Sequence, residues 1–155
     1  STFCGQNLGA GKTDRIKKGI LQGVFVGMAY GLVAGIVLIF FGRTLTLLFV
    51  KPSATAVLDA SAKYLRCLGF FYWSLGILNT CRMTTQGLGY SGRAILSGAV
   101  EMAARCFVSL ALVPIFHFDA ICFADQSAWI TATLYIVPTC LLVVRSIEKK
   151  RKECK

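Results

Sequence analysis

A glycine-rich stretch near the start of the chain contains residue types that bind phosphate. Residues 5–13 read GQNLGAGKT, close to the nucleotide-binding pattern G-x-x-x-x-G-K-[ST]. That pattern requires a strand before the loop and a helix after it. Gly5 lies one position too early for Gly11-Lys12-Thr13, and the four residues before it are too few for a buried strand. We therefore expect no nucleotide to bind here.

A second candidate group is a pair of opposite charges within an otherwise apolar stretch, residues 94–116. Glu101 and Arg105 are four residues apart, so a helix places them on one face, where they can form an ion pair. Charges in an apolar setting are costly unless they are paired. The pair is therefore a functional candidate, although it could equally serve only to fix the rotation of its helix.

A third group of polar and aromatic residues lies in residues 72–86, namely Tyr72, Asn79, Arg82 and Gln86. These side chains could bridge neighbouring helices or line a water-filled cavity, and the sequence does not separate the two. His117 is the sole histidine and no C-x-x-C pair occurs among the seven cysteines. We therefore expect no metal site, no cofactor and no enzymatic activity.

The composition indicates that these groups are positioned by membrane helices. Hydrophobic residues make up 55% of the 155 residues and charged residues only 15%, whereas soluble domains carry about 25% charged residues. A helix needs roughly 20 apolar residues to cross a bilayer. The sequence predicts an all-α membrane protein with four transmembrane helices, at about 20–42, 62–84, 94–116 and 124–144.

The charges outside these spans predict the orientation. Residues 12–18 and 145–155 are rich in lysine and arginine, and Arg93 lies in the link between the second and third spans. With four spans these regions share one side of the membrane, which the positive-inside rule assigns to the cytoplasm. We expect a cytoplasmic loop at 5–19 and a basic cytoplasmic tail at 145–155. The net charge of +10 then suits anionic membrane lipids, not nucleic acid.

Glycines recur every fourth residue at the start of the first predicted span. Such a stripe lets another helix approach closely in a membrane. We interpret it as a packing surface in preference to a pore lining or a hinge. The stripe consists of Gly19, Gly23, Gly27, Gly31 and Gly35.

Four stretches, in order and spacing, resemble the carboxyl-terminal half of MATE (multidrug and toxic compound extrusion) transporters, most of all the branch with NorM and DinF-like proteins. They are GQNLGAGKTDRIKKG, YLRCLGFFYWSLGILNTCRMTTQGLGYSGRAIL, SGAVEMAARCFVSLALVP and ICFADQSAWITA. The resemblance implies a twelve-helix transporter of two six-helix lobes. This chain would be a fragment of it, a single partial domain with the last four helices of the second lobe, and would need the missing amino-terminal lobe as its partner.

The resemblance further implies export of small organic cations or drugs across a bacterial cytoplasmic membrane, in exchange for H⁺ or Na⁺. Glu101 and Arg105 match an acidic–basic pair of the family. Some members carry a cation-binding aspartate in the helix matching 62–84, but this chain has no carboxylate between Arg66 and Arg82. Ion coupling through this lobe therefore stays open. Gln126 stands where the family often has proline, a difference from which we expect little effect.

Two alternatives remain on sequence grounds. A flippase of the same superfamily, which moves a lipid-linked substrate, would need a more cationic cavity, and Arg82 and Arg105 are compatible with one. A small four-helix membrane subunit without a transport role is the other, although the first residue is not Met.

Overall fold

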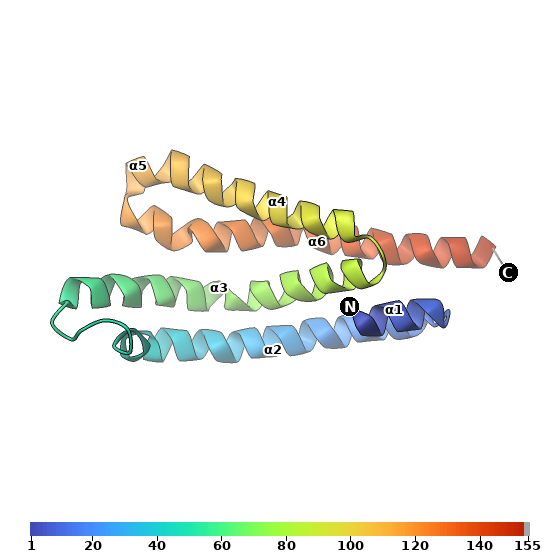
Figure 1. Cartoon of the computed structure of the whole chain (residues 1–155), viewed down its shortest axis with the longest axis horizontal. Coiled ribbons are helices and arrows are strands. Elements are labelled where there is room, and N and C mark those ends of the chain that lie inside the picture. Colours follow the sequence, from blue (N-terminus) through green and yellow to red (C-terminus); the bar gives the residue numbers. More distant parts are fainter. Residues whose placement is uncertain (154–155) are drawn as a thin grey trace.

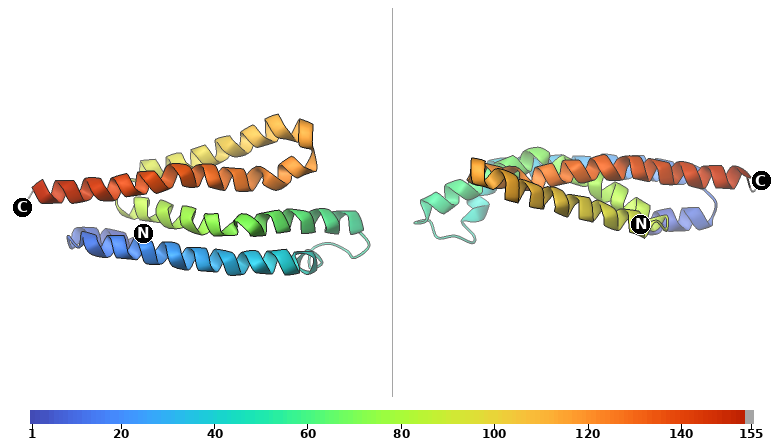
Figure 2. Two further views of the ribbon diagram at one scale, coloured as in Figure 1. Left: turned by 180° about the vertical axis from the view of Figure 1, so that it is seen from behind. Right: turned by 90° about the horizontal axis from the view of Figure 1, so that it is seen from above.

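The computed structural model describes residues 1–153, and every element within them is helical, which confirms the all-α prediction. Four long helical arms lie side by side in the order α2, α3, α6 and α4 (Figure 1), and the view from above shows how thin this layer is (Figure 2). The elements are α1 (Thr2–Gly9), α2 (Thr13–Thr46), α3 (Thr55–Gly87), α4 (Ser91–Phe107), the π-helix η1 (Val108–Leu112), α5 (Val113–Phe116) and α6 (Phe118–Glu153).

Three helical segments of the described chain are long and apolar enough to cross a membrane. They are Thr13–Thr46, Ser91–Phe116 and Phe118–Arg151. The predicted span at 62–84 is not among them, because Asn79, Arg82 and neighbouring polar residues lower its hydropathy. Yet α3, which contains this stretch, lies between α2 and α6 and runs along their length (Figure 1).

The helices extend beyond the predicted apolar spans and correct two boundaries. Residues 5–19, expected as a loop, form the end of α1, a short turn and the start of α2. The expected tail 145–155 is helical as far as Glu153, and its last two residues lie outside the described part. The reason is that hydropathy marks only the lipid-embedded part, whereas a helix continues until a backbone break such as Gly11, whose φ is +66°. A helix, not a strand, therefore precedes the GAGKT segment.

The two ends of the layer differ in charge. The amino-terminal helix α1, the α3–α4 turn and the end of α6 lie at one end, and the α2–α3 loop and α5 lie at the other (Figure 1). The start of α2 and the end of α6 are also joined by Lys17–Glu148 at 2.6 Å and Arg151–Thr13 at 3.3 Å. Basic side chains gather at this first end, from Lys12, Arg15, Lys17, Lys18, Arg93, Arg145, Lys149, Lys150 and Arg151.

The glycine stripe of α2 lies mainly against α3. A Cβ added at Gly35 would stand 2.4 Å from the carbonyl oxygen of Gly69, and one at Gly31 would meet the backbone of Trp73 at 2.8 Å. The stripe has a counterpart on α3, because a Cβ at Gly76 would lie 2.3 Å from the Gly27 carbonyl oxygen. Backbones this close leave no room for side chains. Gly23 also faces α3, through Thr80, whereas Gly19 faces Phe3 of α1.

Candidate functional site

The site that the structure assembles is centred on Glu101 of α4. Its carboxylate accepts a hydrogen bond from Arg82 Nη2 of α3 at 2.7 Å and one from Arg105 Nη2, one turn further along α4, at 3.2 Å. Arg82 is held from its other side as well, because its Nε donates to Ser97 Oγ at 2.9 Å. One carboxylate thus connects two arginines and two helices.

Arg105 continues the connection to a third helix. Its Nε lies 3.0 Å from Asp125 Oδ1 of α6, and the other oxygen of Asp125 accepts a hydrogen bond from the Tyr64 hydroxyl of α3. Together these contacts make an ion-pair chain that joins α3, α4 and α6. We use this name for Ser97, Arg82, Glu101, Arg105, Asp125 and Tyr64 throughout.

The ion-pair chain is largely shielded from solvent, and its charges balance. The exposed fraction of the side chain is 17% for Glu101, 21% for Arg82 and 24% for Asp125, and Arg105 is the most open at 44%. Its two carboxylates match its two guanidinium groups. Balance is needed here because an unpaired charge in an apolar setting costs several kcal/mol.

Helical spacing explains how α4 presents its part of this site. Ser97, Glu101 and Arg105 recur at intervals of four and therefore lie on one face. Ala94 and Ser97 are the buried residues of α4, so this same face packs against the rest of the molecule. Another face of α4 carries large exposed apolar side chains such as Ile95 and Met102, which suits a surface in contact with lipid.

The remaining predicted pathway residues lie apart from the ion-pair chain. Tyr72 and Asn79 line a groove of about 310 Å³ between α2 and α3, together with Tyr30. Tyr72 also packs edge-to-face on Trp129 of α6, with ring centroids 5.9 Å apart. Gln86 is half-buried one turn beyond Arg82. The structure therefore brings together Arg82, Glu101 and Arg105, and not the whole predicted set.

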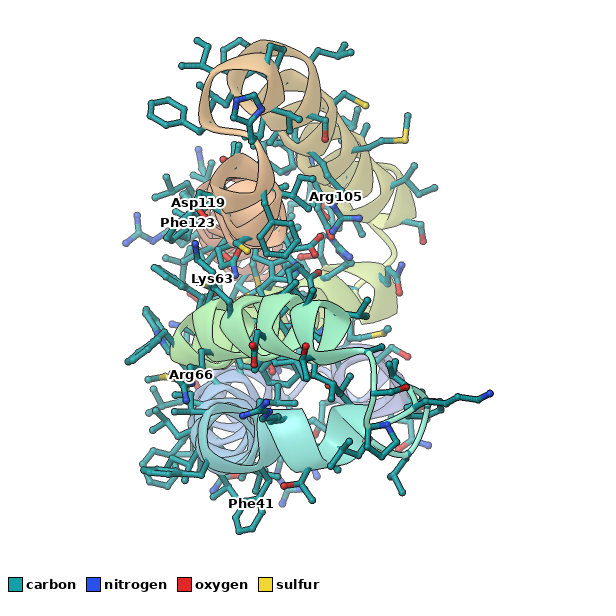
Figure 3. The ribbon with its side chains drawn as sticks, turned by 90° about the vertical axis from the view of Figure 1, so that its left-hand side faces the viewer. Phe41, Lys63, Arg66, Arg105, Asp119 and Phe123 are labelled. Carbon is teal, nitrogen blue, oxygen red and sulfur yellow. The ribbon has the colours of Figure 1, made fainter. Side chains whose placement is uncertain are left out.

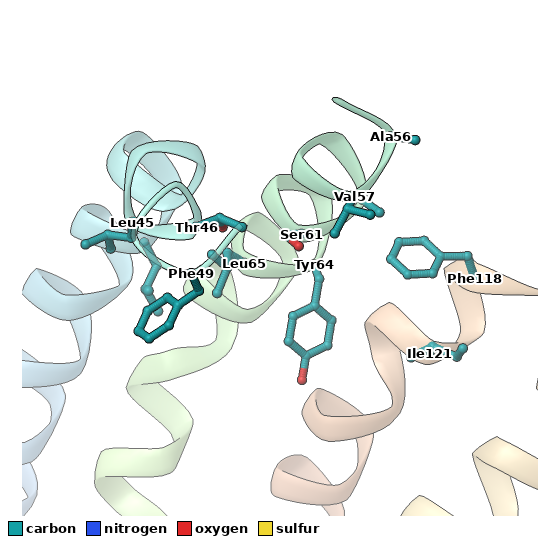
Figure 4. Close-up of a pocket in the computed structure, with 12 residues that line it drawn as sticks. Leu45, Thr46, Phe49, Ala56, Val57, Ser61, Tyr64, Leu65, Phe118 and Ile121 are labelled. Carbon is teal, nitrogen blue, oxygen red and sulfur yellow. The ribbon is translucent and has the colours of Figure 1, made fainter. Parts of the chain in front are cut away.

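A larger apolar groove of about 810 Å³ opens beside the start of α3. Figure 4 shows Tyr64 in its wall, between Phe49 on one side and Phe118 and Ile121 of α6 on the other. Because the Tyr64 hydroxyl also binds Asp125, this residue connects the groove to the ion-pair chain.

A separate ion pair lies on the other side of α6. Lys63 binds Asp119 there, and Figure 3 shows Asp119 and Arg105 on opposite sides of the helix. The Lys63 and Asp119 side chains are 54% and 59% exposed, so this pair is more open to its surroundings. Within residues 1–153, no group of three or more metal-ligating side chains is found.

Sequence reasoning missed three members of the ion-pair chain. Asp125 lies at the start of the span predicted at 124–144, whereas α6 already begins at Phe118 and carries Asp125 into the layer. Ser97 and Tyr64 carried no signal of their own. The available clue was that the second arginine, Arg82, needs a counter-charge within the apolar region, which Glu101 supplies from 19 residues away.

Comparison with known proteins gives one match. A family model described as MatE matches residues 1–105, which include α1 to α3 and most of α4. No curated protein and no solved structure matches the chain. The matched part includes Arg82, Glu101 and Arg105, whereas Asp125 lies beyond it.

Proposed function

Because the chain belongs to the MatE family, whose members are membrane transporters, we propose that it works in a secondary active transporter that exports organic cations or drugs in exchange for H⁺ or Na⁺. In this proposal the four long helices all cross a bacterial cytoplasmic membrane. They form the last four helices of the second six-helix lobe and work with the other lobe. The basic end, which holds both described chain ends, faces the cytoplasm.

The ion-pair chain is the observation that carries this proposal. A coupling ion needs a carboxylate whose neutralisation changes how helices are joined. Glu101 meets this need because it binds Arg82 of α3 and Arg105 of α4 at once. A proton or a sodium ion on Glu101 would weaken both pairs, and α3 and α4 would then be freer to separate. Ion binding and helix movement are thereby linked.

The grooves supply surfaces suited to amphipathic cations. Tyr30 and Tyr72 line the groove between α2 and α3 with Asn79 as a polar partner, and the faces of aromatic rings attract cations. The larger groove is apolar almost throughout and has Tyr64 in its wall. A cation with a large aromatic or aliphatic part therefore fits these surfaces better than a small, strongly hydrated cation does.

The flippase alternative has less support. A lipid-linked substrate with phosphate groups would require free cationic side chains in the layer. Arg82 and Arg105 are instead each paired with a carboxylate, at 2.7 Å and 3.0 Å respectively. The non-transporting subunit is disfavoured by membership in a transporter family.

The test is the Glu101→Gln variant of the complete transporter, expressed in cells that lack other exporters of the dye ethidium. Export should fall at least about tenfold, which corresponds to about 1.4 kcal/mol, at unchanged protein level in the membrane. The matched control is Asp59→Asn, which removes a carboxylate from the open Arg43–Asp59 pair at 3.2 Å. Full export by the Glu101→Gln variant would show that Glu101 takes no part in transport.

A further inference from the structure

Two side chains of α6 carry buried polar atoms that have no hydrogen-bond partner among the described residues. Both amide atoms of Gln126, Oε1 and Nε2, and the Thr133 hydroxyl are in this position. Gln126 is only 1% exposed. Other hydroxyls of α6 behave differently, since Ser127, Thr131 and Thr139 each donate to a carbonyl three or four residues earlier.

Gln126 and Thr133 belong to the stripe of α6 that faces α3. On this stripe, Cys122 before Gln126 is fully buried, and Trp129 after it packs on Tyr72 of α3. Gln126 lies at i+4 from Cys122 and three residues before Trp129, so it shares their face. The interface between α3 and α6 thus encloses both unpartnered groups.

Leaving these groups unpaired would be costly. A buried amide or hydroxyl without a partner loses the hydrogen bonds that it makes with water. Folded proteins usually resolve this with an internal water, which makes about three hydrogen bonds to such groups. Among the described residues, neither the oxygen nor the N–H groups of the Gln126 amide have a partner. A metal cation would satisfy only the oxygen, whereas water both donates and accepts.

We propose that the interface between α3 and α6 holds internal water bound to Gln126, and that this water gives the ion-pair chain access to protons. The second part rests on the proposed function. Asp125 precedes Gln126 and contacts α3 through Tyr64 and α4 through Arg105. Gln126 follows Asp125 directly in α6, and Arg105 connects the Asp125 carboxylate to Glu101.

The charged and titratable groups around Asp125 are consistent with this role. Tyr64 and Arg105 contact it directly, and Glu101 follows through Arg105. On its own helix, Cys122 is buried, and Asp119 is paired with Lys63 on the other side. A proton that reaches Asp125 releases Arg105 from it, and Arg105 then keeps only its contact with Glu101.

Hydroxyl-radical footprinting of the complete transporter in lipid nanodiscs tests the water site. Radiolysis oxidises side chains that lie next to bound water even where bulk solvent does not reach. Trp129 is 8% exposed and follows Gln126 by one turn. We expect Trp129 to be oxidised in the wild type and its oxidation to fall at least about threefold in Gln126→Leu, which has no group to hold water. Phe3, exposed on α1, is the control that should not change.

An unoxidised Trp129 in the wild type, or equal oxidation in both proteins, would overturn the water site. The proton link has a separate readout, the pH dependence of ethidium export by the same two proteins. We expect Gln126→Leu to lose the response of export to pH while Thr133→Val keeps part of it. An unchanged pH response would overturn the link and leave the water site standing. Absence of ion-driven export in the wild type would instead refute the proposed function, while footprinting would still report on the water.

Discussion

At the scale of single residues, the arrangement around Glu101 determines how the molecule should respond to substitution. Glu101 is shared by two arginines, so its loss leaves Arg82 with Ser97 as its one remaining partner among the described residues. Losing Arg82 is milder, because Glu101 keeps Arg105. The two ends of the same ion pair are therefore not equivalent.

This asymmetry gives a prediction for stability. We expect Glu101→Gln to lower the melting temperature of the purified transporter more than Arg82→Gln does. The double variant should lose less stability than the sum of the losses in the two single variants. The coupling free energy should be about 1–3 kcal/mol, as is typical of residues in one ion-pair network. Thermal unfolding followed by tryptophan fluorescence measures it.

The control is the pair Lys17–Glu148, whose side chains are 54% and 24% exposed. Because solvent screens so open a pair, the same cycle there should show a coupling below about 1 kcal/mol. Equal coupling at the two sites would mean that the ion-pair chain is no better shielded from solvent than the Lys17–Glu148 pair.

Residue-level prediction from the sequence succeeded where the partners are neighbours along one helix. The Glu101–Arg105 pair follows from their four-residue spacing, and it is present. Arg82–Glu101 and Arg105–Asp125 join different helices, and helix register is set by packing that periodicity does not specify. Gln126 shows the same limit. Its substitution for proline suggested little effect, whereas burial leaves its amide without a partner in the described chain.

At the scale of elements, the contact between α2 and α3 depends on backbone approach. Gly27 and Gly35 of α2 lie opposite Gly76 and Gly69 of α3, and a Cβ at Gly35 would stand 2.4 Å from a carbonyl oxygen. A backbone atom cannot move aside as a flexible side chain can. The close approach therefore holds only as long as these positions lack side chains.

We expect Gly35→Ala to lower stability by about 1–3 kcal/mol, the usual cost of overfilling a packed contact. The matched control is Gly98→Ala in α4, where a Cβ meets no atom within 4 Å. That change should be neutral or stabilising, since alanine favours a helix by up to about 1 kcal/mol over glycine. Thermal unfolding of both variants in one detergent checks the contrast, and equal effects would contradict tight packing at Gly35.

The sequence indicated the positions of the long helices better than their ends. The apolar runs locate α2, α4 and α6, because burial in lipid requires uncharged residues. The sequence did not indicate α1, which is only eight residues long and lies outside the apolar runs. Nor did it indicate the π-helix at Val108–Leu112, a local widening of the helix one turn before Pro114 that hydropathy does not report.

At the scale of the whole molecule, the layer has a basic end and an opposite end with the α2–α3 loop. In the proposed four-span topology the basic end faces the cytoplasm. The exposed residues Ser53 and Ser91 lie at opposite ends of α3, so they report on this topology.

In a cysteine-free background, we expect Ser53→Cys to react with a membrane-impermeant maleimide added to intact cells. Ser91→Cys should react only after the membrane is opened. Reaction of both residues in intact cells would show that α3 does not cross the membrane.

We propose that this chain belongs to an ion-driven exporter in which Glu101 couples ion binding to export. Its most direct test reconstitutes the complete transporter in liposomes and measures ethidium movement while a pH or Na⁺ gradient is imposed. We predict that one of the two gradients drives ethidium against its own gradient without ATP, that the matching ionophore abolishes this movement, and that Glu101→Gln lacks it. Ethidium movement that ignores both gradients, or that Glu101→Gln retains in full, would contradict the claim.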